Sequence, residues 1–171
     1  LASTPNVTIN SGTPAGTVSS VSDYGNIFPL GGTINSYTIS ATYSGNYTVG
    51  LTGFDNFTSF TGAGGLFAQL NAGVMTGNIT VRVTTSITED GTNDLNSLSY
   101  DVPNANYTLR IIPNDASEKI ISGNVASGLM RFDGNDYVTI DGNNGLDASG
   151  TQYLRFRNTN GAGPTFSFFN D

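Results

Sequence analysis

The chain has 171 residues, enough for one domain with a buried core, and its composition excludes several kinds of chemistry. It contains no Cys and no His, which rules out disulfides, thiol catalysis, the Ser-His-Asp constellation and nearly every zinc site. Six basic against 13 acidic residues give a formal net charge of -7, which argues against binding to nucleic acid or to anionic membrane surfaces. Only 11% of the residues are charged, and Gly, Ser, Thr and Asn are abundant, so the composition favours strands and turns over helices.

The sequence contains no segment that predicts membrane insertion. The sequence starts LASTPNV without an initiator Met, which is typical of a processed or excised piece. Neither a signal-peptide core nor an apolar run long enough to span a bilayer is present, so we expect no membrane insertion.

The first third of the chain predicts a small β-rich part followed by one helix. Residues 1–45 are dense in Ser, Thr, Gly and Pro, and the run SYTISATY at 36–43 alternates as a strand does, so we expect a β-rich lead-in segment. Further on, four apolar residues recur at the spacing of one helical face and predict a short helix over 63–72, with Gly73 and Gly77 as its expected stops. These apolar residues are Leu66, Phe67, Leu70 and Val74.

From Asn78 onward, short apolar runs alternate with polar turns, and one tripeptide recurs. An arginine lies between two apolar residues four times, at positions 82, 110, 131 and 155. This recurrence predicts a β-solenoid in which each coil adds one strand to the same sheet, with the apolar neighbours pointing inward and the arginines outward. The segments 119–123, 137–142 and 165–169 are expected to supply the next face of successive coils. An antiparallel sandwich is the alternative, because it also has short strands at regular intervals.

Residues 46–171 resemble a family of exported proteins. The most specific element is the motif G-x-D-Y-V-T-I-D-G at 134–142, and the segment LNAGV at 70–74 is similar to the end of the family's capping helix. The family is the right-handed parallel β-helix proteins exported by Bacteroidota, many of them cargo of the type IX secretion system. The resemblance implies an all-β fold in which a short N-terminal capping helix precedes the first coils of a right-handed parallel β-helix. It also implies export to the cell surface and a chain that ends within a longer protein, because the family's C-terminal sorting domain is missing.

Aspartates gather in the stretch MRFDGNDYVTIDGNNG at 130–145 and just after it, and three roles are open for them. Carboxylate oxygens on two adjacent turns suit calcium, although the spacing lacks the closing Glu of an EF-hand. Alternatively, they accept hydrogen bonds from backbone N–H groups at the corners of a coil, with glycines 134, 142 and 145 at positive φ. A glycosidase pair is the third role, but the chain between Asp133 and Asp141 is expected to splay the two apart. The calcium candidates are Asp133, Asp136, Asp141 and Asp147, and we assign no catalytic residue and no other cofactor.

The recurring arginines are the candidate binding residues. If they stack on one face, neighbours on rungs about 4.8 Å apart repel each other by roughly 1 kcal/mol in water. Such a column requires anions, supplied either by carboxylates on the same face or by an acidic polysaccharide lying along the solenoid. The predicted column consists of Arg82, Arg110, Arg131 and Arg155.

These patterns together predict an exported or cell-surface solenoid with a structural or adhesive role and no enzymatic activity. A glycan-binding module, a glycoside hydrolase or a polysaccharide lyase on the same β-helix is the first alternative, and a rigid spacer of a filament or viral fibre is the second. The aromatic run TFSFF at 165–169 would lie on an uncapped rung. We therefore expect the partners to be further coils of the parent chain or other surface proteins.

Overall fold

The computed structural model describes residues 40–170 of the chain. Within that range the chain forms ten strands and one short helix, which confirms the all-β class. The expected lead-in segment lies largely outside the described residues, as does the first half of the run at 36–43. Strand β1 (Thr42–Val49) begins before the boundary that we expected at residue 46.

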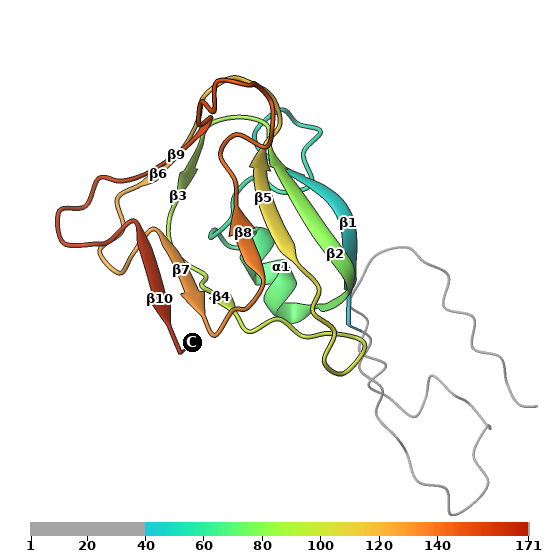
Figure 1. Cartoon of the computed structure of the whole chain (residues 1–171). Coiled ribbons are helices and arrows are strands. Elements are labelled where there is room, and N and C mark those ends of the chain that lie inside the picture. Colours follow the sequence, from blue (N-terminus) through green and yellow to red (C-terminus); the bar gives the residue numbers. More distant parts are fainter. Residues whose placement is uncertain (1–39, 171) are drawn as a thin grey trace, which may run out of the picture. The chain divides into compact units, whose positions relative to one another are not determined.

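The strands form three parallel sheets that surround a common interior (Figure 1). Each strand pairs in parallel with the strand of the next coil in the same sheet. Sheet A contains β1, β2 (Val74–Val83), β5 (Leu109–Pro113) and β8 (Val138–Ile140). Sheet B contains β3 (Ile87–Glu89), β6 (Lys119–Gly123) and β9 (Leu154–Asn158). Sheet C contains β4 (Leu95–Asn96), β7 (Met130–Asp133) and β10 (Phe166–Phe169).

From β2 onward the chain visits sheets A, B and C in turn and repeats this path coil after coil. In sheet A, Ile79 pairs with Leu109, and Leu109 pairs with Val138, so these three residues mark the same point on successive circuits. The result is a β-solenoid of about four turns. The sandwich alternative is wrong, because all the strand pairs of the described chain are parallel rather than antiparallel.

The predicted arginine column does not exist. Arg131 lies on sheet C and Arg155 on sheet B, while Arg82 and Arg110 lie on sheet A in different rows. Arg110 pairs with Thr80 rather than with Arg82. The physical reason is the number of residues in one full coil. The chain segments that join the last three tripeptides are shorter than a full coil, so each next tripeptide falls on another sheet. The second series fails in the same way, since its three segments lie on β6, β8 and β10.

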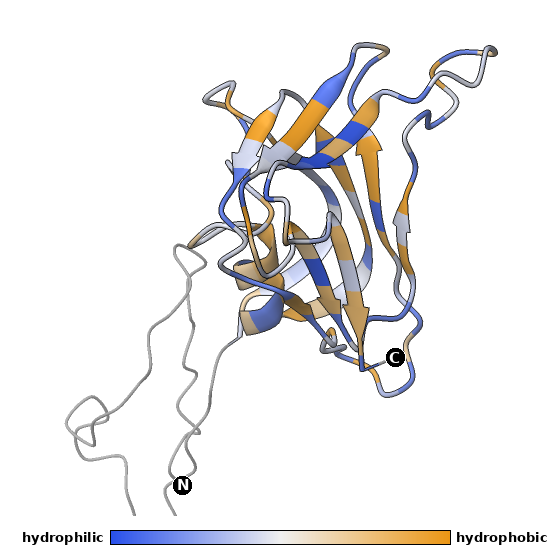
Figure 2. Ribbon diagram, turned by 90° about the vertical axis from the view of Figure 1, so that its left-hand side faces the viewer, coloured by the Kyte–Doolittle hydropathy of each residue, from blue (hydrophilic) through white to orange (hydrophobic). Residues whose placement is uncertain are grey.

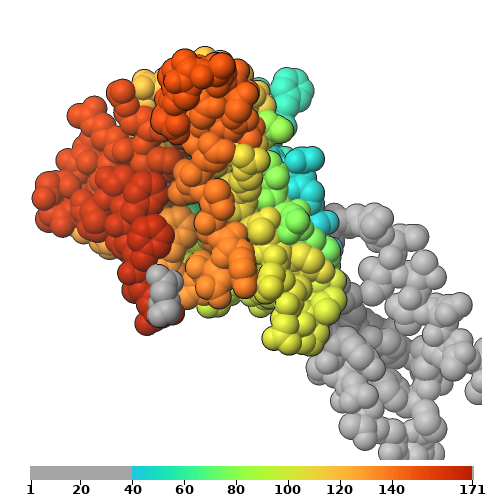
Figure 3. All heavy atoms as spheres, viewed as in Figure 1, coloured from blue at the N-terminus to red at the C-terminus, as the bar shows by residue number. Residues whose placement is uncertain are grey.

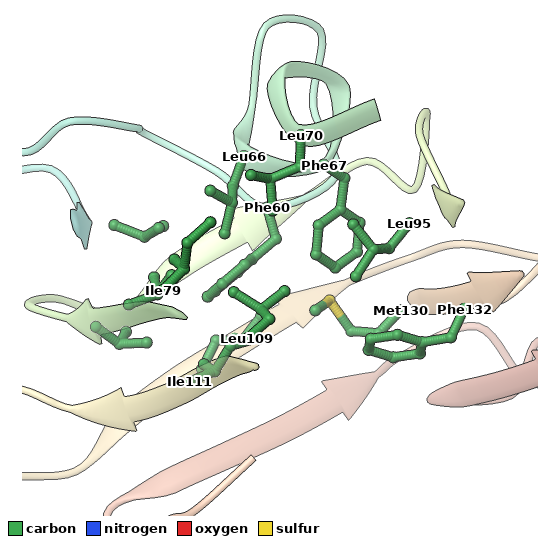
Figure 4. Close-up of a cluster of buried hydrophobic side chains, with 14 of the residues drawn as sticks. Phe60, Leu66, Phe67, Leu70, Ile79, Leu95, Leu109, Ile111, Met130 and Phe132 are labelled. Carbon is green, nitrogen blue, oxygen red and sulfur yellow. The ribbon is translucent and has the colours of Figure 1, made fainter. Parts of the chain in front are cut away.

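The core fills the interior that the three sheets enclose. Alternate side chains of a strand point to opposite faces, so in β7 Met130 and Phe132 are buried while Arg131 between them faces outward. Figure 2 shows this alternation as hydrophobic and hydrophilic blocks along the strands. In Figure 4, Ile79 and Leu109 from sheet A converge with Met130 and Phe132 from sheet C. Burial stabilises the fold by about 1.5–3 kcal/mol for each such side chain.

Helix α1 (Leu66–Ala72) packs against this core and confirms the predicted helix. It begins slightly later than expected, because Gly64 at a φ of +75 keeps the chain in a turn just before it. Its last residue is Ala72, directly before Gly73, so the first of the two expected stops is confirmed; Gly77 and Val74 belong to β2 instead. The helix projects Leu66, Phe67 and Leu70 into the core (Figure 4).

Candidate functional site

Both oxygens of the Asp141 carboxylate bind other groups of the protein. One oxygen accepts hydrogen bonds from the backbone N–H groups of Asn143 and Asn144, at 3.1 and 2.9 Å. The other oxygen pairs with the Arg110 guanidinium at 2.6 Å. The hydrogen bonds from Asn144, Arg110 and Asn143 lower the pKa of Asp141. A glycosidase general acid needs the opposite shift, so these contacts suit a coil corner better than an acid catalyst.

Asp147 and Asp133 also bind neighbouring groups of the chain. Asp147 accepts hydrogen bonds from the hydroxyl and the backbone N–H of Ser149, at 2.6 and 2.8 Å, and these bonds lower its pKa. The Tyr153 hydroxyl donates to the same carboxylate. Asp133 accepts a hydrogen bond from the side-chain amide of Asn170 at 2.5 Å. Across residues 40–170, no three acidic side chains gather as a metal ion would require, so the four calcium candidates form no ligand cluster.

The glycines of this region divide into two kinds. Gly134 and Gly145 have φ values of +64 and +70, which favour glycine at these corners as predicted. The prediction is wrong for Gly142, which is not at positive φ. A Cβ atom at Gly142 would instead lie 2.4 Å from Oε1 of Gln152, so a larger residue would displace that side chain.

The remaining calcium candidate, Asp136, lies in the turn between β7 and β8.

Most of the arginines proposed as a binding column already face a carboxylate. Arg82 is the exception, because it forms no ion pair within the described residues. The three pairs join Arg110 to Asp141 at 2.6 Å, Arg131 to Asp94, and Arg155 to Glu118 at 3.0 Å. Carboxylates of the chain itself therefore neutralise three of the four arginines that we had considered for an external anion.

The outer face of sheet B carries a shallow hollow of about 390 Å³. We call it the sheet B groove, and its lining includes Leu51, Ser86, Thr88, Ile120, Ser122 and Arg157. Thr88 pairs with Ser122 and Ser122 with Arg157, so these three lie in one row across β3, β6 and β9. None of their side chains forms a hydrogen bond or ion pair with another residue of the described chain.

The residues around this row are held in place by hydrogen bonds. Ser86 accepts from the backbone N–H of Ile120 at 2.9 Å, and the backbone N–H of Leu51 donates to the Thr85 hydroxyl at 2.9 Å. At the far side, the Thr159 hydroxyl donates to the Gly123 carbonyl oxygen at 2.9 Å. The groove thus combines a fixed rim with a central row of polar groups that are free to bind a ligand.

Arg157 was not among the binding residues expected from the sequence, although the sequence around it carries a signal. The run Leu154-Arg155-Phe156-Arg157 alternates apolar and basic residues, which places both arginines on the outer face of the same strand. Arg157 stands outside the repeated tripeptide, because Asn158 rather than an apolar residue follows it. Arg155 then turned out to pair with Glu118, while Arg157 lines the groove.

The last coil leaves its inward side chains partly uncovered. Phe168 pairs with Phe132 in the ladder, yet Phe168 is 64% exposed and Phe132 only 2%. A second hollow of about 230 Å³ lies at this end, between these two rings and Val138 and Ile140. In the space-filling view, β8 to β10, coloured orange to red, cover much of the face toward the viewer (Figure 3).

No protein-family model, no curated protein and no solved structure matches the chain. No helix in the described part has the length and apolar character that a membrane crossing demands.

Proposed function

We propose that this chain is a structural and adhesive β-solenoid of an exported or cell-surface protein, without enzymatic activity. The proposal rests mainly on the difference between the two ends of the coil. Side chains of α1 cover the core at the start, whereas the last rung leaves Phe168 exposed above the buried Phe132. This asymmetry suits a rigid shaft that is built up by stacking coils in one direction.

The partner that best fits the open rung is a further coil of the parent chain or of another surface protein. The strands β8, β9 and β10 are the last strands of their sheets, and their outer edges offer backbone groups for a parallel neighbour. Their inward side chains include Val138, Phe156 and Phe168, so the added rung has to be apolar on its inner face.

Export is supported by the resemblance of residues 46–171 to the β-helix proteins of Bacteroidota. The motif at 134–142 covers the turn between β7 and β8 and the whole of β8, which together make one corner and one rung of the coil. On this basis we propose an extracellular location and secretion by a type IX system.

A glycan-binding module on the same scaffold is the second candidate function, and the sheet B groove favours it. The groove offers unpartnered hydroxyl groups and a guanidinium on an exposed flat face. Binding of this kind would provide the adhesive contact of the shaft rather than replace its structural role.

Display of the full chain on a non-adherent bacterium tests the proposal. Cells are washed under flow over surfaces coated with neutral or acidic polysaccharides, beside cells that display an unrelated domain of similar size. We expect more retained cells on at least one surface. The purified chain is also incubated with the same polysaccharides, and we expect neither new reducing ends nor unsaturated uronates.

Two results would count against this function. Retention equal to that of the control cells on every surface would contradict the adhesive role. Release of sugar products that stops in an Asp141→Asn variant would contradict the absence of enzymatic activity.

A further inference from the structure

The geometry points to the sheet B groove as a binding site for the carboxylate or sulfate group of an acidic polysaccharide, with Arg157 as the residue that binds the anion. This inference rests on the proposed adhesive function and names the class of its ligand. It also places the anion site at an arginine outside the predicted column. That column is absent, and three of its members pair with carboxylates.

Arg157 differs from the neighbouring Arg155 in its surroundings. Both side chains point outward from β9, on either side of Phe156. The Arg155 guanidinium lies 3.0 Å from the Glu118 carboxylate, whereas Arg157 faces no carboxylate among residues 40–170. A guanidinium is always charged and offers a planar fork of donors that matches a carboxylate or a sulfate. Arg157 therefore has the chemistry for an external anion, while Arg155 has its partner within the chain.

The row that Arg157 completes suits a sugar. Thr88, Ser122 and Arg157 lie on consecutive rungs, about 4.8 Å apart, so their polar groups follow the solenoid axis. Hydroxyl groups both donate and accept hydrogen bonds, as the hydroxyl groups of a saccharide require. Beside the row, Ile120 and the exposed Leu51 offer apolar surface for the C–H face of a sugar ring.

The charge of the protein narrows the class of ligand. A net charge of -7 repels densely charged polyanions, and nucleic acid binding normally neutralises several phosphates with several cations. The groove contains one arginine among its hydroxyl and aliphatic side chains. It therefore fits a polysaccharide whose anionic groups are separated by neutral sugars.

Titration of the full chain with three defined oligosaccharides tests this inference. The probes are a hyaluronan octasaccharide with carboxylates on alternate sugars, a chondroitin sulfate octasaccharide that adds sulfates, and a neutral oligomer of N-acetylglucosamine. Calorimetry at low salt measures the affinities. We expect at least one anionic probe to bind about tenfold or more tightly than the neutral oligomer, and the first two probes show whether carboxylate or sulfate is preferred.

Two matched variants assign the binding to the groove. Arg157→Gln removes the free guanidinium and should weaken the anionic probes by about tenfold while leaving the neutral oligomer unchanged. Arg155→Gln removes the same charge from the same face of β9 and should change each affinity by less than about twofold. Thermal unfolding checks that both variants are folded. We expect that they are, because neither side chain belongs to the core.

Three outcomes would overturn the inference. These are equal affinity for anionic and neutral probes, equal loss in the two variants, and no binding of any probe. Each leaves the proposed structural and adhesive role standing, provided that displayed cells still adhere to a surface. A failure of adhesion with intact, Arg157-dependent binding in solution would instead contradict the proposed function alone.

Discussion

The buried carboxylate of Glu89 accepts two hydrogen bonds from Thr61, one from its hydroxyl at 2.6 Å and one from its backbone N–H at 2.7 Å. Glu89 also accepts from the backbone N–H of Phe60 at 2.8 Å. The acceptor lies on β3, and the donors lie in the segment that leads into α1. This one side chain therefore ties the first coil to the segment that covers its end.

Replacing Glu89 with Gln should lower the free energy of unfolding by at least about 2 kcal/mol. A glutamine has only one acceptor oxygen, so its NH2 group would face a backbone N–H that already needs an acceptor. Urea unfolding measures the loss. The control is Glu118→Gln, which removes the exposed partner of Arg155 and should cost less than about 1 kcal/mol. Equal losses in the two variants would show that Glu89 does not hold the segment in place.

The ion pair between Asp115 and Lys119 predicts a pH dependence of stability. The Lys119 side chain is only 5% exposed, and its ammonium lies 2.7 Å from the carboxylate. Hydrogen bonds from Lys119 and Ser117 lower the pKa of Asp115 from 3.8 to about 2. Because the folded-state pKa is depressed, the stabilisation is complete above the unfolded pKa near 3.8 and disappears as the pH falls through about 2.

The Asp115→Asn variant isolates this effect. At pH 7 we expect it to be less stable than the original chain by no more than about 1 kcal/mol, because Asp115 is half exposed and solvent screens the pair. The difference should shrink between pH 4 and pH 2 and vanish below that range. Denaturant unfolding of both proteins across these pH values measures it, and a difference that stays constant would contradict the assignment.

Gly123 is required by packing rather than by its backbone angles. A Cβ atom at this position would lie 2.4 Å from the backbone oxygen of Glu89 and 2.5 Å from Cδ1 of Leu129. Gly123→Ala should therefore destabilise the fold by about 1–3 kcal/mol. Gly161→Ala is the matched control, because nothing lies within 4 Å of its Cβ position, and should change stability by less than about 0.5 kcal/mol. Thermal unfolding compares the two, and similar melting temperatures would refute the packing argument.

The two stacked rings of sheet C should differ in their contribution to stability. Phe132 and Phe168 have ring centroids 5.2 Å apart, but only Phe132 is buried. Phe132→Ala should cost about 3–5 kcal/mol because it leaves a cavity in the core. Phe168→Ala should cost less than about 1.5 kcal/mol in this chain, because most of the ring stays in water. Equal costs would mean that the last rung is already covered.

A chain with one more coil tests the open end directly. A second copy of residues 107–133 is attached after Asp171, so that the copied Leu109 follows Phe169 at the same interval as Val138 follows Asp133. We expect a higher melting temperature and a larger cost of Phe168→Ala than in the original chain. The control copy carries Ser at Leu109, Ile111 and Ile121, and it should give neither effect. Equal behaviour of the two extended chains would contradict stacking through an apolar inner face.

The sequence by itself determined the local features of this protein. Alternation placed Met130 and Phe132 inside and Arg131 outside, because successive side chains of a strand point to opposite faces. Helical spacing located α1, and the acidic and glycine-rich turn at Asp141 indicated a corner, because these residues bind backbone groups only a few positions away.

Only the tertiary structure decided which strands share a sheet. Each strand pairs with one that lies a full coil further along the chain. The register of that pairing depends on the combined length of the three turns in a coil, so a repeated tripeptide cannot predict it. The prediction of an arginine column was wrong for this reason. The row of Thr88, Ser122 and Arg157 is likewise visible only in the pairing of β3, β6 and β9. The groove is formed by residues that are distant in the chain, and their proximity comes from the register of the coils.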